Sequence, residues 1–257
     1  MNLRHLRVEL ADAVATITID RSPVNAVNLE LIDDFLTAVS GLAGEAAARA
    51  LVITGVAGRF CAGADIAMMR DVSRANHERV RRWVDVQAAL EGLAKPVIAA
   101  INGYALGGGA ELVLACDYRW MAADAAIGFP EIGLGIFPGA GGTQRLTRLL
   151  GPARALDVMI SGRRLTSAEA LEAGLVQRVV APDALAPDVR AFARDLAAKP
   201  TRAIGLLKRC VYGGLGTPLA EGLELERRAV FEVIATRDAA EGLDAFLEKR
   251  VPRFTGS

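Results

Sequence analysis

The sequence is poor in the residues that build metal sites and disulfide frameworks. Its 257 residues include two histidines and three widely separated cysteines, which are His5, His77, Cys61, Cys116 and Cys210. A sparse, odd number of cysteines without a CxxC pair is typical of a reducing compartment and argues against a disulfide scaffold or a zinc site. With so few histidines, we expect neither a bound metal nor a Ser-His-Asp triad.

The sequence also lacks an excess charge of either sign and any long apolar run. Lys plus Arg and Asp plus Glu both number 30, so the formal net charge is zero. A balanced charge argues against a general role in binding nucleic acid or a membrane surface. No apolar run reaches the roughly 18 residues that a membrane span needs, and residues 1–10 lack the apolar segment of a signal peptide. We therefore expect a cytoplasmic protein without nucleic-acid or membrane partners.

Three familiar active-site motifs are missing as well. Glycines 107–109 do not belong to a GxxxxGK[ST] motif, so they do not form a Walker loop. Neither glycine cluster reads GxGxxG, and no serine lies in GxSxG. NAD binding and nucleophilic serine chemistry therefore lose most of their support.

What is present is an apolar chain of 52% hydrophobic residues, whose length fits one domain or one domain with a small appendage. Short β-rich or apolar runs predict strands at residues 14–19, 50–54 and 96–101 and within 118–129. Apolar periodicity predicts helices at residues 28–42 and 76–93, with a loop and an irregular helix over 57–75. After Gly142 the pattern is helical almost to the end. This order predicts an α/β core followed by a helical segment.

Two glutamates stand out because each is a single charge in an apolar stretch. Glu111 follows three glycines and precedes LVLAC, and Glu131 lies in FPEIGLGIFPG. Burial of a lone carboxylate raises its pKa, and two carboxylates in an apolar cleft supply a general acid and a general base. The alternative for each is structural: the side chain caps a helix or pairs with an arginine.

The glycine run next to Glu111 has a catalytic interpretation as well. Glycines 107–109 open a helix, so their free N–H groups and the positive end of the helix dipole point outward, where they could bind an oxyanion. A second loop, CAGAD at residues 61–65, follows a buried strand and could aim another N–H. The alternative for both loops is a tight turn with close packing.

Taken together, four stretches resemble the crotonase, or enoyl-CoA hydratase/isomerase, superfamily. They are FCAGADI, KPVIAAINGYALGGGAELVLACD, FPEIGLGIFPGAGGTQRL and FLEKRVPRF, in the order found in the family. The resemblance covers nearly the whole chain. It implies a spiral core of ββα units, assigned here to residues 1–195, and a helical C-terminal trimerisation region at residues 196–257. It also implies a homotrimer or a hexamer built as a dimer of trimers.

The resemblance further assigns roles to individual positions. The acyl-CoA thioester oxygen would lie between the amides of Ala64 and Gly108, beside the catalytic glutamates Glu111 and Glu131. The remaining substrate contacts that it implies are Val24, Ala62, Asp65, Ile66, Gly107, Pro138, Gly139, Phe246 and Lys249, the last two across a subunit boundary. One departure from the family is Ala67, where members often carry a basic residue for the CoA phosphate.

A hydratase with these residues would add water across the 2,3 double bond of a trans-2-enoyl-CoA. It would need no cofactor, because coenzyme A is part of the substrate. The nearest alternative is a Δ3,Δ2-enoyl-CoA isomerase or another acyl-CoA-processing member. Such isomerases typically keep the glutamate that matches Glu131 and lack the one that matches Glu111. A third alternative is a non-catalytic member that binds RNA or protein, against which the balanced charge and the intact glutamate pair both count.

Overall fold

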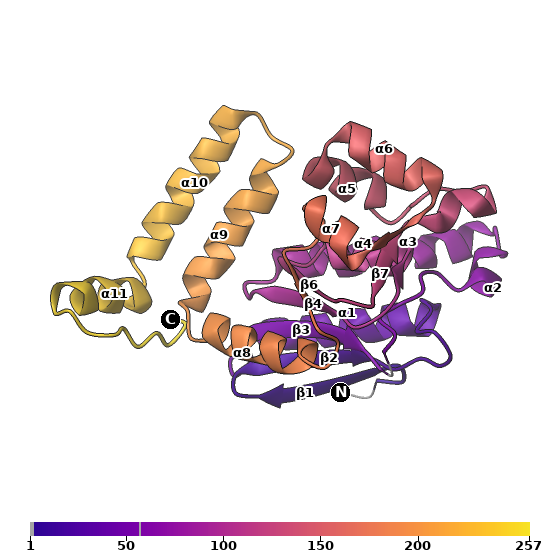
Figure 1. The fold of residues 1–257 in the computed structure, drawn as a ribbon. Coiled ribbons are helices and arrows are strands. Elements are labelled where there is room, and N and C mark those ends of the chain that lie inside the picture. The colour runs from indigo at the N-terminus through magenta and orange to yellow at the C-terminus, as the bar shows by residue number, and fades with distance from the viewer. Residues whose placement is uncertain (1–2, 57) are drawn as a thin grey trace.

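The chain folds around a six-stranded sheet, which the computed structural model describes over residues 3–56 and 58–257. The strand order is β1-β2-β3-β4-β6-β9, with bounds Leu6–Ala11, Val14–Ile19, Ala50–Gly55, Val97–Ile101, Tyr118–Ala122 and Arg178–Val180. Only β1 and β2 pair in antiparallel fashion; the other neighbours are parallel. Parallel neighbours require crossover connections, and helices α1 (Leu29–Gly44) and α3 (Arg74–Gly92) supply two of them (Figure 1).

A second, smaller sheet lies beside the first and carries the functional loops. Its three strands are β5 (Ala105–Leu106), β7 (Ala126–Gly128) and β8 (Arg164–Thr166), in that spatial order. Strand β5 runs parallel to β7, and β8 runs antiparallel to β7. Strand β5 leads into helix α4 (Gly108–Leu114), and β7 leads into the 3-10 helix η1 (Pro130–Leu134).

The core lies between the large sheet and the helices that cover it. Every residue of β4 and of α4 is buried, as expected for a parallel strand covered on both faces. Helix α8 (Leu185–Ala197) packs on β2, β3, β4 and β6. The remaining helices of the core are α2 (Ile66–Met69), α5 (Gly142–Leu150), α6 (Pro152–Ser161) and α7 (Ser167–Glu172).

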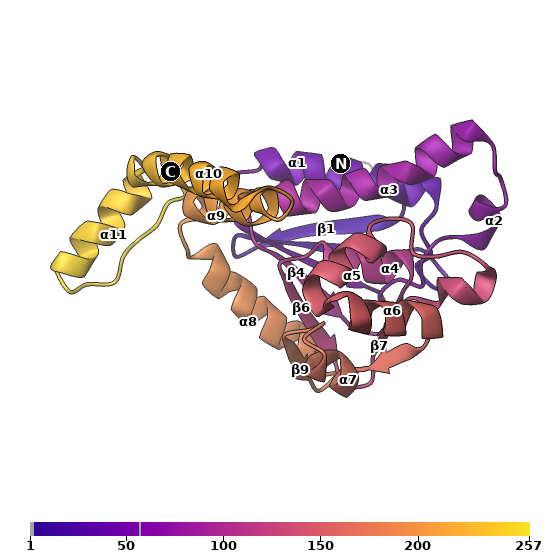
Figure 2. The same cartoon turned by 90° about the horizontal axis from the view of Figure 1, so that it is seen from above.

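Three helices follow the core and extend away from it. Helices α9 (Thr201–Gly214) and α10 (Leu219–Ile234) form an antiparallel pair, and α11 (Arg237–Leu247) projects beyond them (Figures 1 and 2). The final residues return to the core, where Nη1 of Arg49 donates a 2.8 Å hydrogen bond to the carbonyl oxygen of Phe254. Whether residues 196–257 form a separate unit stays a prediction. Over the described residues, no helix combines the length and apolarity that crossing a membrane requires.

The strands and helices predicted for the first 142 residues are confirmed, but the predictions differ from the structure in two other respects. Strand β1 was not predicted, although Leu6, Val8 and Leu10 alternate with charged residues in the manner of a strand with one covered face. The prediction of helix almost throughout after Gly142 is wrong at β8 and β9. These three-residue strands depend on partners far along the chain, which local periodicity does not report. Residue 57 of the predicted 57–75 segment lies outside the part of the chain that the structure describes, and so do residues 1 and 2 of the N-terminal segment 1–10.

Candidate active site

The two candidate carboxylates lie together because they follow neighbouring parallel strands. Glu111 is on α4, which comes directly after β5, and Glu131 is on η1, which comes directly after β7. Strands β5 and β7 are parallel, with Ala105 opposite Ile127. The carboxyl ends of parallel strands meet at one edge of a sheet, so the topology brings both side chains to the same place.

Glu111 is almost completely buried and is held by backbone amides. Its side chain is 2% exposed, and Oε1 accepts hydrogen bonds of 2.8 Å from the amides of Ala140 and Gly142. Burial raises the pKa of Glu111, and these two amides and the charge of Arg145 act in the opposite direction. The carboxylate therefore neither caps its own helix nor forms an ion pair with an arginine among the described residues.

Glu131 has a less satisfied environment. Its Oε2 atom is buried and has no hydrogen-bond partner among the described residues. Burial raises the pKa of Glu131 to about 7; its own backbone amide opposes the shift, and the charge of Glu111 adds to it. A carboxyl that titrates near neutral pH exchanges protons readily in either direction. Because the charge of Glu111 contributes to the raised pKa of Glu131, the protonation of one carboxyl affects that of the other.

Glycine is required at two positions next to these carboxylates. Gly107 has φ +52°, and a Cβ atom there would lie 2.8 Å from Oε1 of Glu131. A Cβ atom at Gly142 would lie 2.9 Å from Oε1 of Glu111. The backbone thus approaches each carboxylate more closely than any other residue would allow.

The two candidate oxyanion amides are placed by a matching register. Cys61 forms a parallel bridge with Ala105, and Ala64 and Gly108 each lie three residues further along. A Cβ atom at Gly108 would lie 3.6 Å from the amide nitrogen of Ala64, so the two loops are in contact.

Both amides are free of backbone acceptors. The amide of Val27 donates to the carbonyl of Gly63, and the carbonyl of Val27 accepts from the amide of Asp65. These two hydrogen bonds turn the intervening amide of Ala64 away from Val27. Gly108 is the first residue of α4, so its N–H has no acceptor within the helix. Over residues 3–56 and 58–257, neither amide donates to another backbone group outside helices and strands.

The other predicted contacts at the N-terminal side gather around the Ala64 loop. The amide of Ala62 donates a 3.1 Å hydrogen bond to the carbonyl of Val24, and the side chains of Val24 and Ile66 are 42% and 55% exposed. Asp65 caps α2 and forms a 2.8 Å ion pair with Arg21, and the hydrogen bond from Arg21 lowers the pKa of Asp65. The carboxylate of Asp65 is thus occupied, and its amide and carbonyl are bonded to Val27 and Met69.

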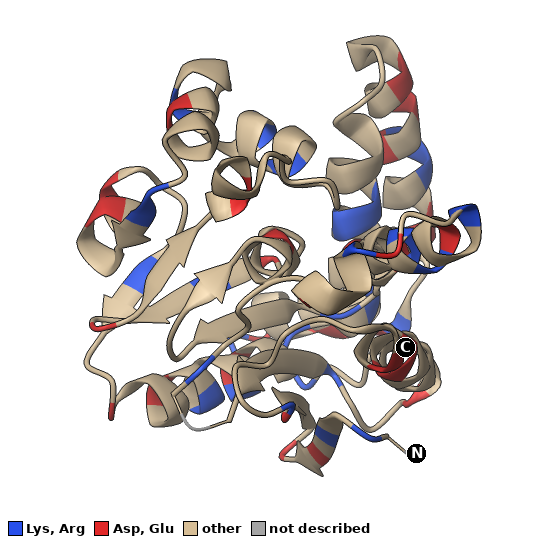
Figure 3. Cartoon of the chain, turned by 90° about the vertical axis from the view of Figure 1, so that its right-hand side faces the viewer, with Lys and Arg blue, Asp and Glu red and all other residues tan. Residues whose placement is uncertain are grey.

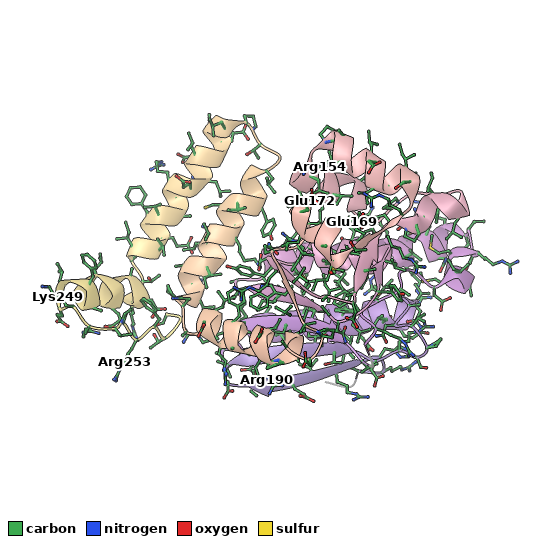
Figure 4. All side chains as sticks on the ribbon, in the orientation of Figure 1. Arg154, Glu169, Glu172, Arg190, Lys249 and Arg253 are labelled. Atoms are coloured by element: carbon green, nitrogen blue, oxygen red, sulfur yellow. The ribbon has the colours of Figure 1, made fainter. Side chains whose placement is uncertain are left out.

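The remaining predicted contacts divide into two groups. Pro138 and Gly139 directly precede Ala140, whose amide holds Glu111, so they lie beside the carboxylate pair. Phe246 lies in the last turn of α11, which projects away from α4 within this chain (Figure 1), and Lys249 follows that helix at its far end (Figure 4). Phe246 is 82% exposed. A single chain therefore does not bring these two residues to the site, and their contact across a subunit boundary stays a prediction.

The structure adds site residues that the sequence did not indicate. The amides of Ala140 and Gly142 hold Glu111, although they lie 29 and 31 residues away from it along the chain. Nε1 of Trp83 donates a 3.1 Å hydrogen bond to the carbonyl of Gly108. Trp83 belongs to the helix that apolar periodicity predicts at residues 76–93, but nothing in that pattern distinguishes a core tryptophan from one that contacts the loop of Gly108. Among the described residues no cluster of His, Cys, Asp or Glu could hold a metal ion.

Comparison with known proteins places the chain in a family. The family model for enoyl-CoA hydratase/isomerase matches residues 9–257. A probable enoyl-CoA hydratase of Mycobacterium tuberculosis is 40% identical over 256 residues, covering 99% of each chain. A crotonyl-CoA hydratase of Syntrophomonas wolfei is 38% identical over 257 residues, again covering 99% of each.

Solved structures agree with the sequence comparison. An enoyl-CoA hydratase from Bacillus anthracis superposes with a TM-score of 0.93 at 38% identity, covering 99% of this chain and 100% of the other. One from Geobacillus kaustophilus gives a TM-score of 0.96 at 34% identity, covering 100% and 98%. The chain belongs to the enoyl-CoA hydratase/isomerase family and has the crotonase fold.

Proposed function

We propose that the protein hydrates a trans-2-enoyl-CoA to the 3-hydroxyacyl-CoA, with Glu111 and Glu131 as the acid–base pair. The observation that carries this proposal is the meeting of two carboxylates of raised pKa with two backbone amides that lack backbone acceptors. The two carboxylates accept and donate protons, and the two amides bind a developing negative charge. Hydration of an enoyl thioester needs both at one place.

In the proposed reaction, the amides of Ala64 and Gly108 bind the thioester oxygen. They polarise the conjugated double bond and stabilise the enolate-like charge as the oxygen of water bonds to C3. One glutamate accepts a proton from that water, and a proton is delivered to C2, so that H and OH are added and no group leaves. The order of the two proton transfers belongs to the coupled pair and not to either residue alone.

Each carboxylate suits a part in this scheme. Glu111 keeps a fixed position because Oε1 accepts two amide hydrogen bonds. Glu131 has an unpartnered Oε2 atom, which is available to a water molecule. We propose that the two hold that water over C2 and C3 from either side. The reaction written in this way uses no cofactor beyond the CoA of the substrate.

The rival isomerase function shifts a double bond without adding water. It uses a single glutamate in the family, and here the second, Glu111, is present and firmly held, which favours hydration. A non-catalytic nucleic-acid-binding role has little support, because positive and negative residues are interspersed along the helices in Figure 3 and the net charge is zero.

Mass spectrometry and ultraviolet absorption of the products together separate these functions. The protein is incubated with crotonyl-CoA and, separately, with a trans-3-enoyl-CoA. Hydration adds the mass of one water to crotonyl-CoA, whereas isomerisation of the trans-3 substrate leaves its mass unchanged and is detected by the absorption of the conjugated enoyl thioester that forms. Water addition to crotonyl-CoA supports the proposal; isomerisation without hydration would support the rival function instead.

We also propose that the chain assembles as a trimer or a dimer of trimers through its C-terminal helices. Large apolar side chains are exposed along α9, α10 and α11: Leu207, Val211, Leu215, Leu219, Leu223, Val230, Phe231, Ile234, Leu243, Phe246 and Leu247. An apolar surface of this extent marks an interaction site. A neighbouring subunit on these helices would bury it, and Phe246 and Lys249 would then reach the CoA of that neighbour.

A further inference from the structure

One face of helix α3 contacts both halves of the candidate site. Trp83, Gln87 and Glu91 are spaced four residues apart, so they lie in a row along the helix. Trp83 and Gln87 are 3% and 0% exposed, and the side chain of Glu91 is 19% exposed. Trp83 contacts the loop of Gly108, and Gln87 and Glu91 contact Arg145 in α5.

Trp83 fixes the loop that carries the oxyanion amide. Its Nε1 atom donates a 3.1 Å hydrogen bond to the carbonyl of Gly108. A Cβ atom at Gly108 would lie 3.3 Å from Nε1 of Trp83 and 3.6 Å from the amide nitrogen of Ala64. The indole therefore lies against Gly108 close to the contact of the two oxyanion loops. Phe35 meets the indole edge to face, with ring centroids 5.3 Å apart, and so restricts its movement.

Gln87 and Glu91 fix the loop that holds Glu111. Nε and Nη2 of Arg145 donate hydrogen bonds of 2.6 and 2.8 Å to the two carboxylate oxygens of Glu91. Nη1 of Arg145 donates a 2.7 Å bond to Oε1 of Gln87. A two-pronged arginine–carboxylate pair has a defined geometry. Arg145 lies three residues after Gly142, whose amide bonds to Glu111, so this clamp sets the first turn of α5 relative to α3.

We propose that α3 is the positioning helix of the active site. Trp83 positions the amide of Gly108, and the Gln87–Arg145–Glu91 clamp positions the amides that hold Glu111. Neither group touches the substrate; both act through the backbone of a loop. The kinetic consequences of this inference rest on the proposed function. Its structural consequences are tested by a separate spectroscopic measurement.

The first test compares W83F with W120F. Phenylalanine keeps an aromatic ring at position 83 and removes the N–H donor. Trp120 is a matched control, because it is also buried, at 4% exposed, and stacks on Phe192 with ring centroids 4.8 Å apart. We expect W83F to lower kcat for crotonyl-CoA hydration roughly 10-fold, less than the loss of a whole oxyanion donor. KM should change little, and W120F should resemble the wild type.

A bound chromophore reports the oxyanion contact without any reaction. The absorption band of a para-aminobenzoyl thioester of CoA, which has no 2,3 double bond to hydrate, moves to longer wavelength as its carbonyl is polarised, so the size of the shift on binding measures the two amides. We expect W83F to give a smaller shift than the wild type and W120F to give the same shift. If the wild type binds this probe but does not hydrate crotonyl-CoA, the proposed function fails while the positioning role of Trp83 remains testable.

The second test compares R145K with R148K. Lysine keeps the positive charge but cannot bond to both oxygens of Glu91 and to Gln87 at once. Arg148 is on the same helix and, within the part of the chain that the structure describes, bonds only to exposed Gln144. We expect R145K to lower kcat roughly 10-fold, the scale of a small displacement of a catalytic group, while the chromophore shift stays unchanged. Equal kinetics and spectra for W83F and W120F, or equal kcat for R145K and R148K, would overturn the proposal.

Discussion

The amide of Gly142 donates a 2.8 Å hydrogen bond to Oε1 of Glu111, and a Cβ atom at the same glycine would lie 2.9 Å from that oxygen. The bond and the requirement for glycine thus have one origin. A backbone that approaches a buried carboxylate closely enough to satisfy it leaves no space for a side chain. Glu111 is therefore oriented by the peptide backbone and not by another side chain.

Replacement of Gly142 by alanine should displace Glu111 without removing it. The new Cβ atom would also lie 2.7 Å from Cβ of Pro138, so the backbone has little freedom to move away. We expect Gly142→Ala to lower kcat for crotonyl-CoA hydration by at least about 10-fold, because a small displacement of a catalytic group is costly. Gly133→Ala is the control, since a Cβ atom there meets nothing within 4 Å. Equal kcat for the two variants would contradict this interpretation of Glu111.

The raised pKa of Glu131 predicts how stability depends on pH. Folded Glu131 titrates at about 7, against a reference value of 4.5, so the folded protein binds this proton more tightly than the unfolded chain. The wild type therefore loses stability as pH rises from about 4.5 to 7, and the loss persists above pH 7. Glu131→Gln removes this titration. The free energy of unfolding of the variant, relative to wild type, should increase by about 1–3 kcal/mol between pH 5 and pH 8.

Urea denaturation of both proteins at one concentration and at several pH values measures this difference. A relative stability that stays constant from pH 5 to pH 8 would show that Glu131 titrates alike in the folded and unfolded states. Such a result would contradict the claim that burial prepares the carboxyl of Glu131 for proton transfer.

The site was predictable from sequence only in part, and the division has a physical reason. Glu111 and Glu131 stand out because a single charge in an apolar motif is conspicuous, and the glycines beside them point to close backbone approach. What holds Glu111 could not be predicted, because Ala140 and Gly142 reach it only through the pairing of β5 with β7. The same limit applies to Trp83, whose position in an apolar stripe indicates burial but not the carbonyl that it meets.

The fold shows a similar division. Strands such as Ala50–Gly55, whose residues are nearly all buried, carry their own apolar signature. Strand Leu6–Ala11 lies at the edge of the sheet and is held by its ladder to Val14–Ile19. Its residues Leu6, Val8 and Leu10 alternate with Arg7 and Glu9, so the local pattern did carry a strand signal and the prediction missed it. The overall crotonase fold was predicted from the resemblance of the motifs. Apolar periodicity alone predicts only an α/β core followed by a helical end.

The exposed apolar side chains of α10 predict an assembly that point substitutions disrupt. Light scattering at low micromolar concentration should give a trimer or hexamer for the full chain, with more than roughly 2,000 Å² buried in total at each interface, as obligate interfaces do. Leu223→Glu combined with Phe231→Glu places charge on side chains that are 53% and 66% exposed, and should give smaller species. Glu226→Gln on the same helix should not. A fully active full-length monomer would refute the assembly and leave the hydration chemistry intact.

The most direct test of the two-carboxylate account is the rate of crotonyl-CoA hydration by E111Q and E131Q beside the wild type. Glutamine keeps the size of each side chain and removes its capacity to exchange a proton. The account predicts that each substitution lowers kcat by at least about 10²-fold, the usual scale for loss of a general acid or base, while acyl-CoA still binds. If either variant keeps a kcat near that of the wild type, the catalytic role proposed for that glutamate is wrong.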